Sequence, residues 1–111
     1  MGIQSVAKIA TILSGAAISD AINTTGDFYL AGILHPVITI STAFTFQVSN
    51  DGITYLPLYD AGSPVSYTID PAVPAAVTVA PSTFYAWEYV KFVVADNQAA
   101  DRTITAIVRQ Y

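Results

Sequence analysis

Few side chains in this sequence could carry out acid–base or nucleophilic chemistry. His35 is the only histidine, and it stands before Pro36 in an apolar stretch without a serine or acidic partner at a recognisable spacing. Glu88 is the only glutamate and lies between Trp87 and Tyr89, whereas glycosidase chemistry needs two carboxylates facing a cleft. We therefore expect His35 to be a turn residue, Glu88 to be a strand or interface residue, and the protein to lack enzymatic activity. The partners of a catalytic triad can be distant in sequence, so an enzyme stays open as the minor alternative.

Aspartates in turn-like segments are the candidate metal ligands. Their carboxylates are oxygen ligands that suit Ca²⁺, but none forms the spaced acidic loop of an EF-hand, and aspartate is favoured in turns because its side chain bonds to the local backbone. The chain has no cysteine, which excludes disulfides and zinc–thiolate sites. We expect no metal and no other cofactor, with a loop calcium as the alternative. The aspartates concerned are Asp51, Asp60, Asp70, Asp96 and Asp101.

Aromatic side chains are the remaining candidates for a binding site. Tyr85, Trp87 and Tyr89 lie within five residues of each other, next to Phe84. Exposed rings can stack on sugars or anchor a protein interface, while buried rings would only fill the core and its rim. Between the two binding alternatives, a protein interface is favoured over a sugar site. Further rings that could serve either role are Tyr55, Tyr59 and Tyr67.

Composition favours an interface because charge is scarce. The chain has 111 residues, of which 53% are hydrophobic and only 11% charged, and its net charge is −4. High hydrophobicity excludes a disordered chain, and the acidic balance argues against nucleic-acid binding. Monomers rarely expose large apolar patches. We therefore expect one face to be covered by partner molecules, with a homotrimer as the favoured oligomer.

The elements that must position these side chains are strands. Residues typical of strands, the β-branched and aromatic types, dominate the sequence, and turn signals recur about every ten residues. This predicts an all-β protein, a single antiparallel β-sandwich domain spanning residues 1–111. About eight strands are expected, at Gln4–Leu13, Phe28–Leu34, Phe44–Ser49, Ile53–Tyr59, Val65–Asp70, Ala75–Val79, Tyr85–Ala95 and Arg102–Gln110.

Several connections are also predicted. For Ala16–Ile22 the four-residue spacing of Ile18 and Ile22 would suit one helical turn, but the segment is short, and an irregular loop that places both isoleucines in the core is favoured. Val37–Ser41 should be a short extended piece. The sequence Asn50-Asp51-Gly52 is typical of a three-residue hairpin loop. The strand with Pro57 should lie at a sheet edge or carry a bulge there, because proline cannot donate a ladder hydrogen bond.

A membrane-spanning segment is not expected. The stretch from Phe28 to Asn50 contains no Asp, Glu, Lys or Arg, and a spanning helix needs about 20 mostly apolar residues. However, this stretch contains His35-Pro36 and alternates strictly from Phe44 onward, which is typical of a strand. The sequence near Lys8 resembles a signal peptide only loosely.

Two segments resemble known proteins. The hairpin from Phe46 to Tyr55, with its Ser-Asn-Asp-Gly turn, resembles discoidin-like jelly rolls, as do the segments Trp87–Phe92 and Arg102–Arg109. The whole chain, including the Ser14–Ala21 segment, is similar to small phage virion structural proteins. The resemblance implies a jelly-roll-like fold.

The resemblance also implies a function. It implies a capsid decoration or cement protein, made in the host cytoplasm and located on the capsid surface of the virion. Its partners would be the major capsid protein and further copies of itself, with no nucleic acid and no membrane. Alternatives are a phage tail or head–tail module and a carbohydrate-binding jelly roll. The expected contact residues are an N-terminal arm and the aromatic cluster: Ile3, Gln4, Ser5, Val6, Tyr85, Trp87 and Tyr89.

Overall fold

The described chain is built almost entirely of strands. The computed structural model describes residues 5–24 and 28–110. Its elements are β1 (Ser5–Ile12), β2 (Ile18–Asn23), β3 (Phe28–His35), β4 (Ala43–Ser49), β5 (Leu56–Pro57), β6 (Tyr59–Asp60), β7 (Ser63–Pro64), β8 (Tyr67–Thr68), β9 (Ala75–Thr78), the 3₁₀ helix η1 (Pro81–Phe84), β10 (Tyr89–Val93) and β11 (Arg102–Gln110). No helix among these residues is long and apolar enough to cross a membrane.

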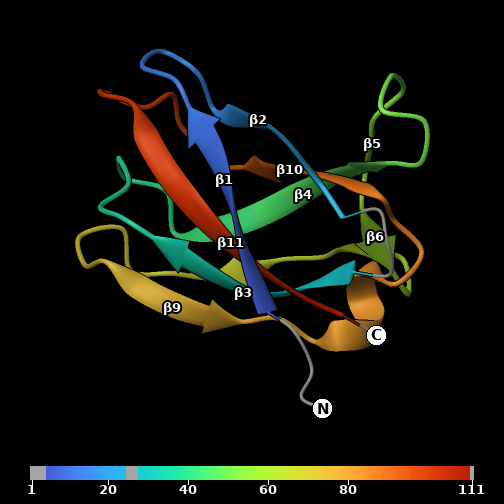
Figure 1. Ribbon diagram of the computed structural model, residues 1–111. Coiled ribbons are helices and arrows are strands. Elements are labelled where there is room, and N and C mark those ends of the chain that lie inside the picture. Colours follow the sequence, from blue (N-terminus) through green and yellow to red (C-terminus); the bar gives the residue numbers. More distant parts are fainter. Residues whose placement is uncertain (1–4, 25–27, 111) are drawn as a thin grey trace.

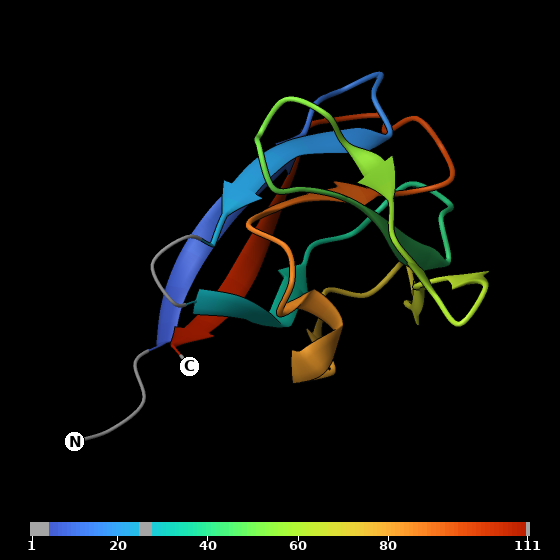
Figure 2. The same cartoon turned by 90° about the vertical axis from the view of Figure 1, so that its right-hand side faces the viewer.

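Two larger antiparallel sheets face each other, and β6 and β7 form a separate two-stranded sheet. The first sheet has the order β1-β11-β3-β9, and the second has the order β2-β10-β4-β5, with β8 also paired to β4. The chain alternates between the sheets, so that strands far apart in sequence become neighbours, as β1 and β11 do along one flank (Figures 1 and 2). Eight strands in this order form a jelly-roll arrangement. The predicted all-β sandwich is confirmed.

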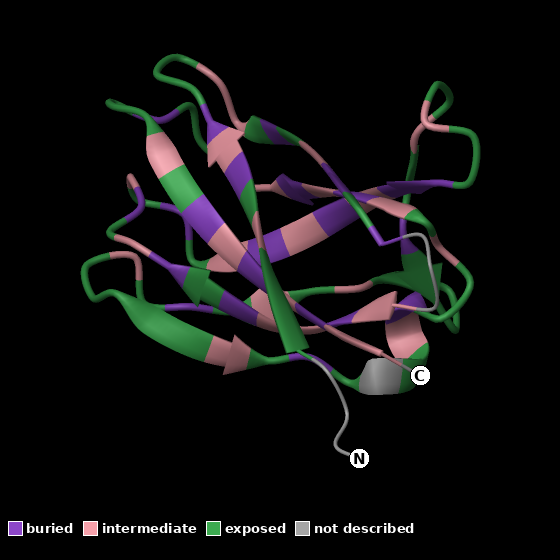
Figure 3. Ribbon diagram, in the orientation of Figure 1, coloured by how far each residue is buried: buried purple, intermediate pink, exposed green. Residues whose placement is uncertain are grey.

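The core lies between the sheets and follows the period-two pattern of the strands. Phe44, Phe46 and Val48 are buried, and buried residues alternate with more exposed ones along β11 and at the end of β1 (Figure 3). The ring of Phe46 makes edge contacts with Phe84 and Phe92, at centroid distances of 5.0 and 5.8 Å. Side chains of both sheets therefore fill a single core.

The prediction of an irregular loop at Ala16–Ile22 is wrong, because β2 begins at Ile18 and pairs with β10. Ile22 is buried, but Ile18 is exposed rather than inserted in the core. The register shifts in β10 between Lys91 and Val93. There the buried Ser19 hydroxyl accepts a hydrogen bond from the Phe92 amide, at 2.9 Å. A buried serine thus takes a core position that hydrophobic patterning did not reveal.

The predicted three-residue hairpin is also wrong in length. Gly52 has the expected left-handed backbone, with φ of 74°. Asp51 Oδ1 then accepts hydrogen bonds from the amides of Ile53 and Thr54, at 2.8 and 2.9 Å. These bonds keep the chain turning, so pairing with β4 resumes only at Leu56. The strand expected at Ile53–Tyr59 is therefore reduced to β5 and the first residue of β6, and β5 with Pro57 lies at the sheet edge.

Three other segments differ from expectation. The strand predicted at Val65–Asp70 is limited to β8, which pairs with the start of β4. The long strand predicted at Tyr85–Ala95 is limited to β10, because the chain leaves η1 in a turn in which the Trp87 amide donates to Phe84 O. The extended piece predicted at Val37–Ser41 contains a tight turn. There, the Ser41 amide donates to Thr39 O at 2.6 Å, and the residue between them has a positive φ.

Candidate interaction surfaces

The outer surface of the first sheet is almost uncharged. The pairing register places the outward side chains of β1, β11, β3 and β9 in rows, for example Ile9, Thr105, Leu34 and Ala76. Within the described ranges Arg109 is the one charged member of this surface, which we call the neutral face. Its members are Ser5, Ala7, Ile9, Thr11, Tyr29, Gly32, Leu34, Ala76, Thr78, Thr103, Thr105, Ile107 and Arg109.

A shallow hollow of about 260 Å³ lies in the neutral face. Gly32 lines this hollow, together with Ile107, Leu34 and Arg109 among others. A Cβ atom at Gly32 would be 3.6 Å from Val77 O and 3.7 Å from Ile107 Cβ, which are ordinary contacts. Nothing in the fold therefore requires glycine here, and its effect is to leave the hollow open.

The N-terminal contact residues predicted from the sequence fall partly on this face. Ile3 and Gln4 lie outside the described residues. Ser5 belongs to the neutral face, opposite Arg109. Val6 is 39% exposed at the sheet edge and points to the other side, because it pairs with the buried Val108. Of the two described residues of this segment, Ser5 thus extends the neutral face and Val6 does not.

Of the predicted aromatic cluster, Tyr85 borders the neutral face. Its exposed ring packs edge-on against Tyr29, with centroids 5.1 Å apart. Tyr29 in turn pairs with Arg109. The Tyr85 ring therefore extends the neutral face beyond the N-terminal end of β3.

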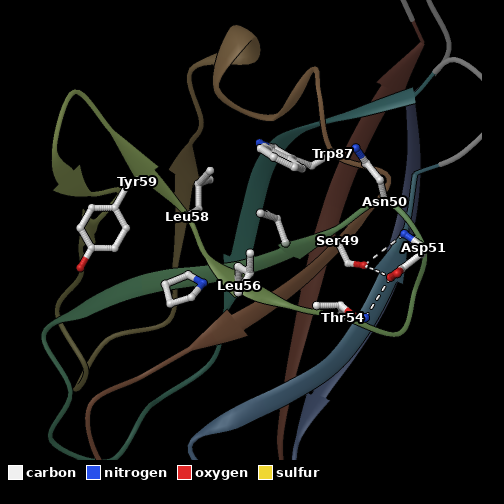
Figure 4. A pocket seen from close by; sticks show the side chains of 10 residues that line it. Ser49, Asn50, Asp51, Thr54, Leu56, Leu58, Tyr59 and Trp87 are labelled. Atoms are coloured by element: carbon white, nitrogen blue, oxygen red, sulfur yellow. Dashed lines mark hydrogen bonds between the residues drawn. The ribbon is translucent and has the colours of Figure 1, made fainter.

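Trp87 lies in a different place, on one wall of a cleft of about 520 Å³. The cleft is lined mostly by apolar side chains, among them Leu56 and Leu58, and the Ser49–Asp51 turn forms its polar side (Figure 4). Asn50 Oδ1 accepts a hydrogen bond from the Glu88 amide at 3.0 Å, which fixes this turn against the segment that carries Trp87. The cleft is thus a formed feature with an aromatic wall.

Tyr89 lies on the outer surface of the second sheet. Its ring packs against Gly52, and the nearby Lys91 ammonium lies 4.2 Å from the ring centroid of Tyr55. Burial raises the pKa of Tyr55, and the neighbouring Tyr89 and Asp51 contribute to the shift. Tyr85, Trp87 and Tyr89 are therefore distributed over three surfaces, because the turn after η1 and the alternation of β10 separate them.

The loops at one end of the sandwich form a surface that sequence reasoning missed. Three of them are joined by Gln98, which is buried. Its Oε1 accepts from the Thr39 amide at 2.7 Å, and its backbone oxygen accepts from Gly15 N at 2.8 Å. A fourth loop is attached where the Ile38 amide donates to Pro71 O. The three loops that surround the Gln98 loop each carry exposed aliphatic side chains. These are Leu13 after β1, Val37 and Ile40 after β3, and Val73 after β8.

Ile40 is the most exposed of these residues, at 74%, and its backbone is strained. Its φ of 58° is rare for a β-branched residue and costs of the order of 1–3 kcal/mol. Asp96 lies beside it, since its amide donates to Ser41 Oγ at 3.1 Å. We call this surface, with Leu13, Val37, Ile40, Val73 and the exposed Asp70, Asp96 and Asp101, the loop end.

Two of the candidate catalytic and metal-binding residues, His35 and Asp51, make contacts within the fold. His35 is buried, donates from Nδ1 to Pro36 O at 2.8 Å and packs edge-on against Phe44. Asp51 uses its carboxylate in the turn after β4, and its hydrogen bonds to backbone amides and Ser49 lower its pKa to about 2. Over residues 5–24 and 28–110, no three His, Asp or Glu side chains gather as a metal site would require.

Comparison with known proteins adds no family to this description. A function is therefore inferred from the fold and from the surfaces described above. No protein-family model matches the chain, and no curated protein matches it either.

Proposed function

We propose that this protein is a phage virion structural protein that decorates the outside of the capsid and stabilises it through non-covalent contacts. Its partners are the major capsid protein and other copies of itself, with a trimer as the favoured assembly. The observation that carries this proposal is the neutral face, where Arg109 is the one charged side chain among the described outward residues.

Exposure of the neutral face to water is unfavourable in an isolated chain, which favours a structural role in which a partner covers this face. Ile9 and Leu34 are exposed and lie in the same row of this sheet. A surface of this kind is stabilised when a partner covers it, at about 25 cal/mol for each Å² of apolar area buried. Neutral contacts also change little with salt, because screening acts on charges.

The phage assignment is supported by the sequence resemblance and by the jelly-roll arrangement, which occurs in viral capsid proteins. A fold alone does not determine function. A tail or head–tail module of the same virion would use the same neutral contacts. The location and copy number of labelled protein on particles would distinguish these two positions.

Deletion of the gene from the phage that encodes the chain tests this function. We expect particles without the protein to lose their DNA at lower temperature, and purified protein to rebind them and restore stability. Ile9→Glu, on the neutral face, should abolish rebinding, because it disrupts the contacts of this face with the capsid protein or with the neighbouring copies through which the assembly attaches. Ser66→Glu, at an exposed position outside this face, should not. Particles that neither lose stability nor bind the protein would refute the proposal.

The Trp87 cleft supports a second candidate, a carbohydrate-binding module. An indole wall with a polar turn beside it matches a sugar ring, which has one apolar face and a hydroxyl rim. Trp87 is the only tryptophan, so its fluorescence reports directly on this cleft. A saturable fluorescence change with one sugar, absent in Leu56→Asp, would support this function. No change with any sugar on a broad panel would exclude it.

A further inference from the structure

We propose that copies of this chain join head to tail, with the loop end of one copy seated on the neutral face of the next. In this contact Ile40 enters the hollow over Gly32, and Asp96 forms an ion pair with Arg109. The inference names the partner surface of the oligomer that the proposed function includes, and to that extent it rests on that function.

Ile40 has the properties of an inserted knob. Its side chain is exposed in a turn whose positive φ would suit glycine or asparagine better than a β-branched residue. Folding gains nothing from an isoleucine that is both strained and solvated. The backbone strain and the exposure of Ile40 therefore point to a role in binding rather than in folding, and insertion into a partner is such a role.

The turn that carries Ile40 is held firmly, as a docking element needs to be. Its neighbours Ile38 and Ser41 are both buried. Thr39 Oγ1 accepts hydrogen bonds from the Ala99 amide at 3.2 Å and from Arg102 Nη2 at 3.0 Å. Because the turn is already ordered, binding through Ile40 costs little further conformational entropy.

The hollow over Gly32 has the properties of the matching hole. It is open because Gly32 has no side chain, and its volume of about 260 Å³ is ample for the side chain of one isoleucine. Ile107 and Leu34 provide apolar walls. The lining of the hollow thus matches an aliphatic side chain.

The charges of the two surfaces are complementary. Arg109 lines the hollow, and its buried Nε has no hydrogen-bond partner among the described residues. Buried donors of this kind are normally satisfied. On the loop end, the exposed Asp96 is next to the Ile40 turn, and its carboxylate accepts no hydrogen bond from the described residues. Pairing across the interface would give the Asp96 carboxylate a partner and would neutralise the charge of the Arg109 guanidinium.

The two surfaces are different parts of the chain, so the contact is heterologous. Such contacts form a closed ring when the rotation between copies closes, and a ring of three would be the favoured trimer. A standard interface covers about 800 Å² on each partner. The chain exposes 5928 Å², which is enough for both contacts and leaves surface for a capsid.

Sedimentation velocity of the purified chain tests the contact. We expect a concentration-dependent oligomer at micromolar protein. Ile40→Gly, which relieves the backbone strain, and Gly32→Leu, which fills the hollow, should each weaken association more than about tenfold. Both should keep the circular dichroism spectrum of the folded chain. Val65→Ala, outside both surfaces, is the control and should associate like the unmodified chain.

Two further experiments test the head-to-tail arrangement of the copies and the ion pair between Asp96 and Arg109. A copy with Ile40→Asp keeps an intact hollow, and a copy with Gly32→Leu keeps an intact knob, so an equal mixture should form dimers that do not grow further. Asp96→Arg and Arg109→Asp should each dissociate the oligomer, and the double variant should restore it.

The outcomes separate this inference from the proposed function. A chain that stays monomeric at high concentration, or a mixture that forms no dimers, would overturn the head-to-tail contact. If such a chain still bound capsids, the proposed function would stand without this contact. An oligomer with the expected variant pattern that ignores capsids would support the contact and refute the function.

Discussion

The ring of Tyr89 packs directly against the backbone of Gly52. A Cβ atom at Gly52 would lie 3.2 Å from Cζ of this ring, closer than side chains normally approach. Through this contact the turn after β4 is held against the outer surface of β10. The position therefore requires glycine for two separate reasons, the positive φ and the ring.

Substitutions at three glycines distinguish the effect of the positive φ from that of the Tyr89 ring. Gly52→Ala should cost about 2–4 kcal/mol, from left-handed backbone strain and from the clash with the ring. Gly15→Ala has the strain alone, because its Cβ would meet nothing within 4 Å, and should cost about 1–2 kcal/mol. Gly32→Ala has neither and should stabilise the strand by about 0.5–1 kcal/mol. Urea unfolding measures all three, and equal costs at Gly52 and Gly15 would show that the ring simply moves aside.

Asp51 should make stability depend on pH in the acid range. Hydrogen bonds from Ile53, Thr54 and Ser49 lower its pKa from 3.8 to about 2 in the folded chain. A lowered folded-state pKa gives stability that is present above the unfolded-state pKa and is lost as pH falls from about 4 to 2. In Asp51→Asn this contribution is absent, so its stability should decline less over that interval.

Unfolding by urea at a series of pH values checks this dependence. Asp60→Asn is the matched control, because it changes the net charge equally and Asp60 is an exposed residue whose carboxylate takes no hydrogen bond from the described chain. Parallel pH profiles for Asp51→Asn and the unmodified protein would contradict the assignment.

Phe46 should be among the most sensitive core positions. Its ring meets the rings of Tyr67, Phe84 and Phe92, so it connects β4 with β8, η1 and β10. Phe46→Ala should destabilise the fold by about 3–5 kcal/mol, and Phe46→Leu should cost much less because it leaves a smaller cavity. Thermal unfolding by calorimetry is the measurement. A small loss for the alanine variant would mean that neighbouring rings collapse into the space.

The long strands and the core could be predicted from the sequence because their pattern is local. Strict alternation from Phe44 to Val48 and in the last strand is sufficient to identify the buried side chains. β2 escaped prediction because a serine occupies a buried position, where it bonds to the Phe92 amide. Such a partner, 73 residues away, leaves no local signal.

The surfaces could be predicted only in part. Scarce charge indicated that a neutral surface exists, but its position follows from the pairing of β1, β11, β3 and β9, which local patterns do not determine. The loop end was missed because its aliphatic residues are single residues in separate turns. They come together through the hydrogen bonds of Gln98, and no local pattern in the sequence marks them.

Gln98 should stabilise the loop end more than any exposed residue there. Its buried amide accepts from Thr39 N and donates to Asp96 O at 2.9 Å. Gln98→Leu has a similar volume but leaves these buried backbone groups without partners, at a cost of about 2–4 kcal/mol. Urea unfolding should show this loss, and the Thr39 amide should exchange its hydrogen much faster. Asn97→Ala, at an exposed neighbour, should change neither quantity. If Gln98→Leu unfolds like the unmodified chain, water must replace the amide, and the loops would be joined less rigidly than their hydrogen bonds imply.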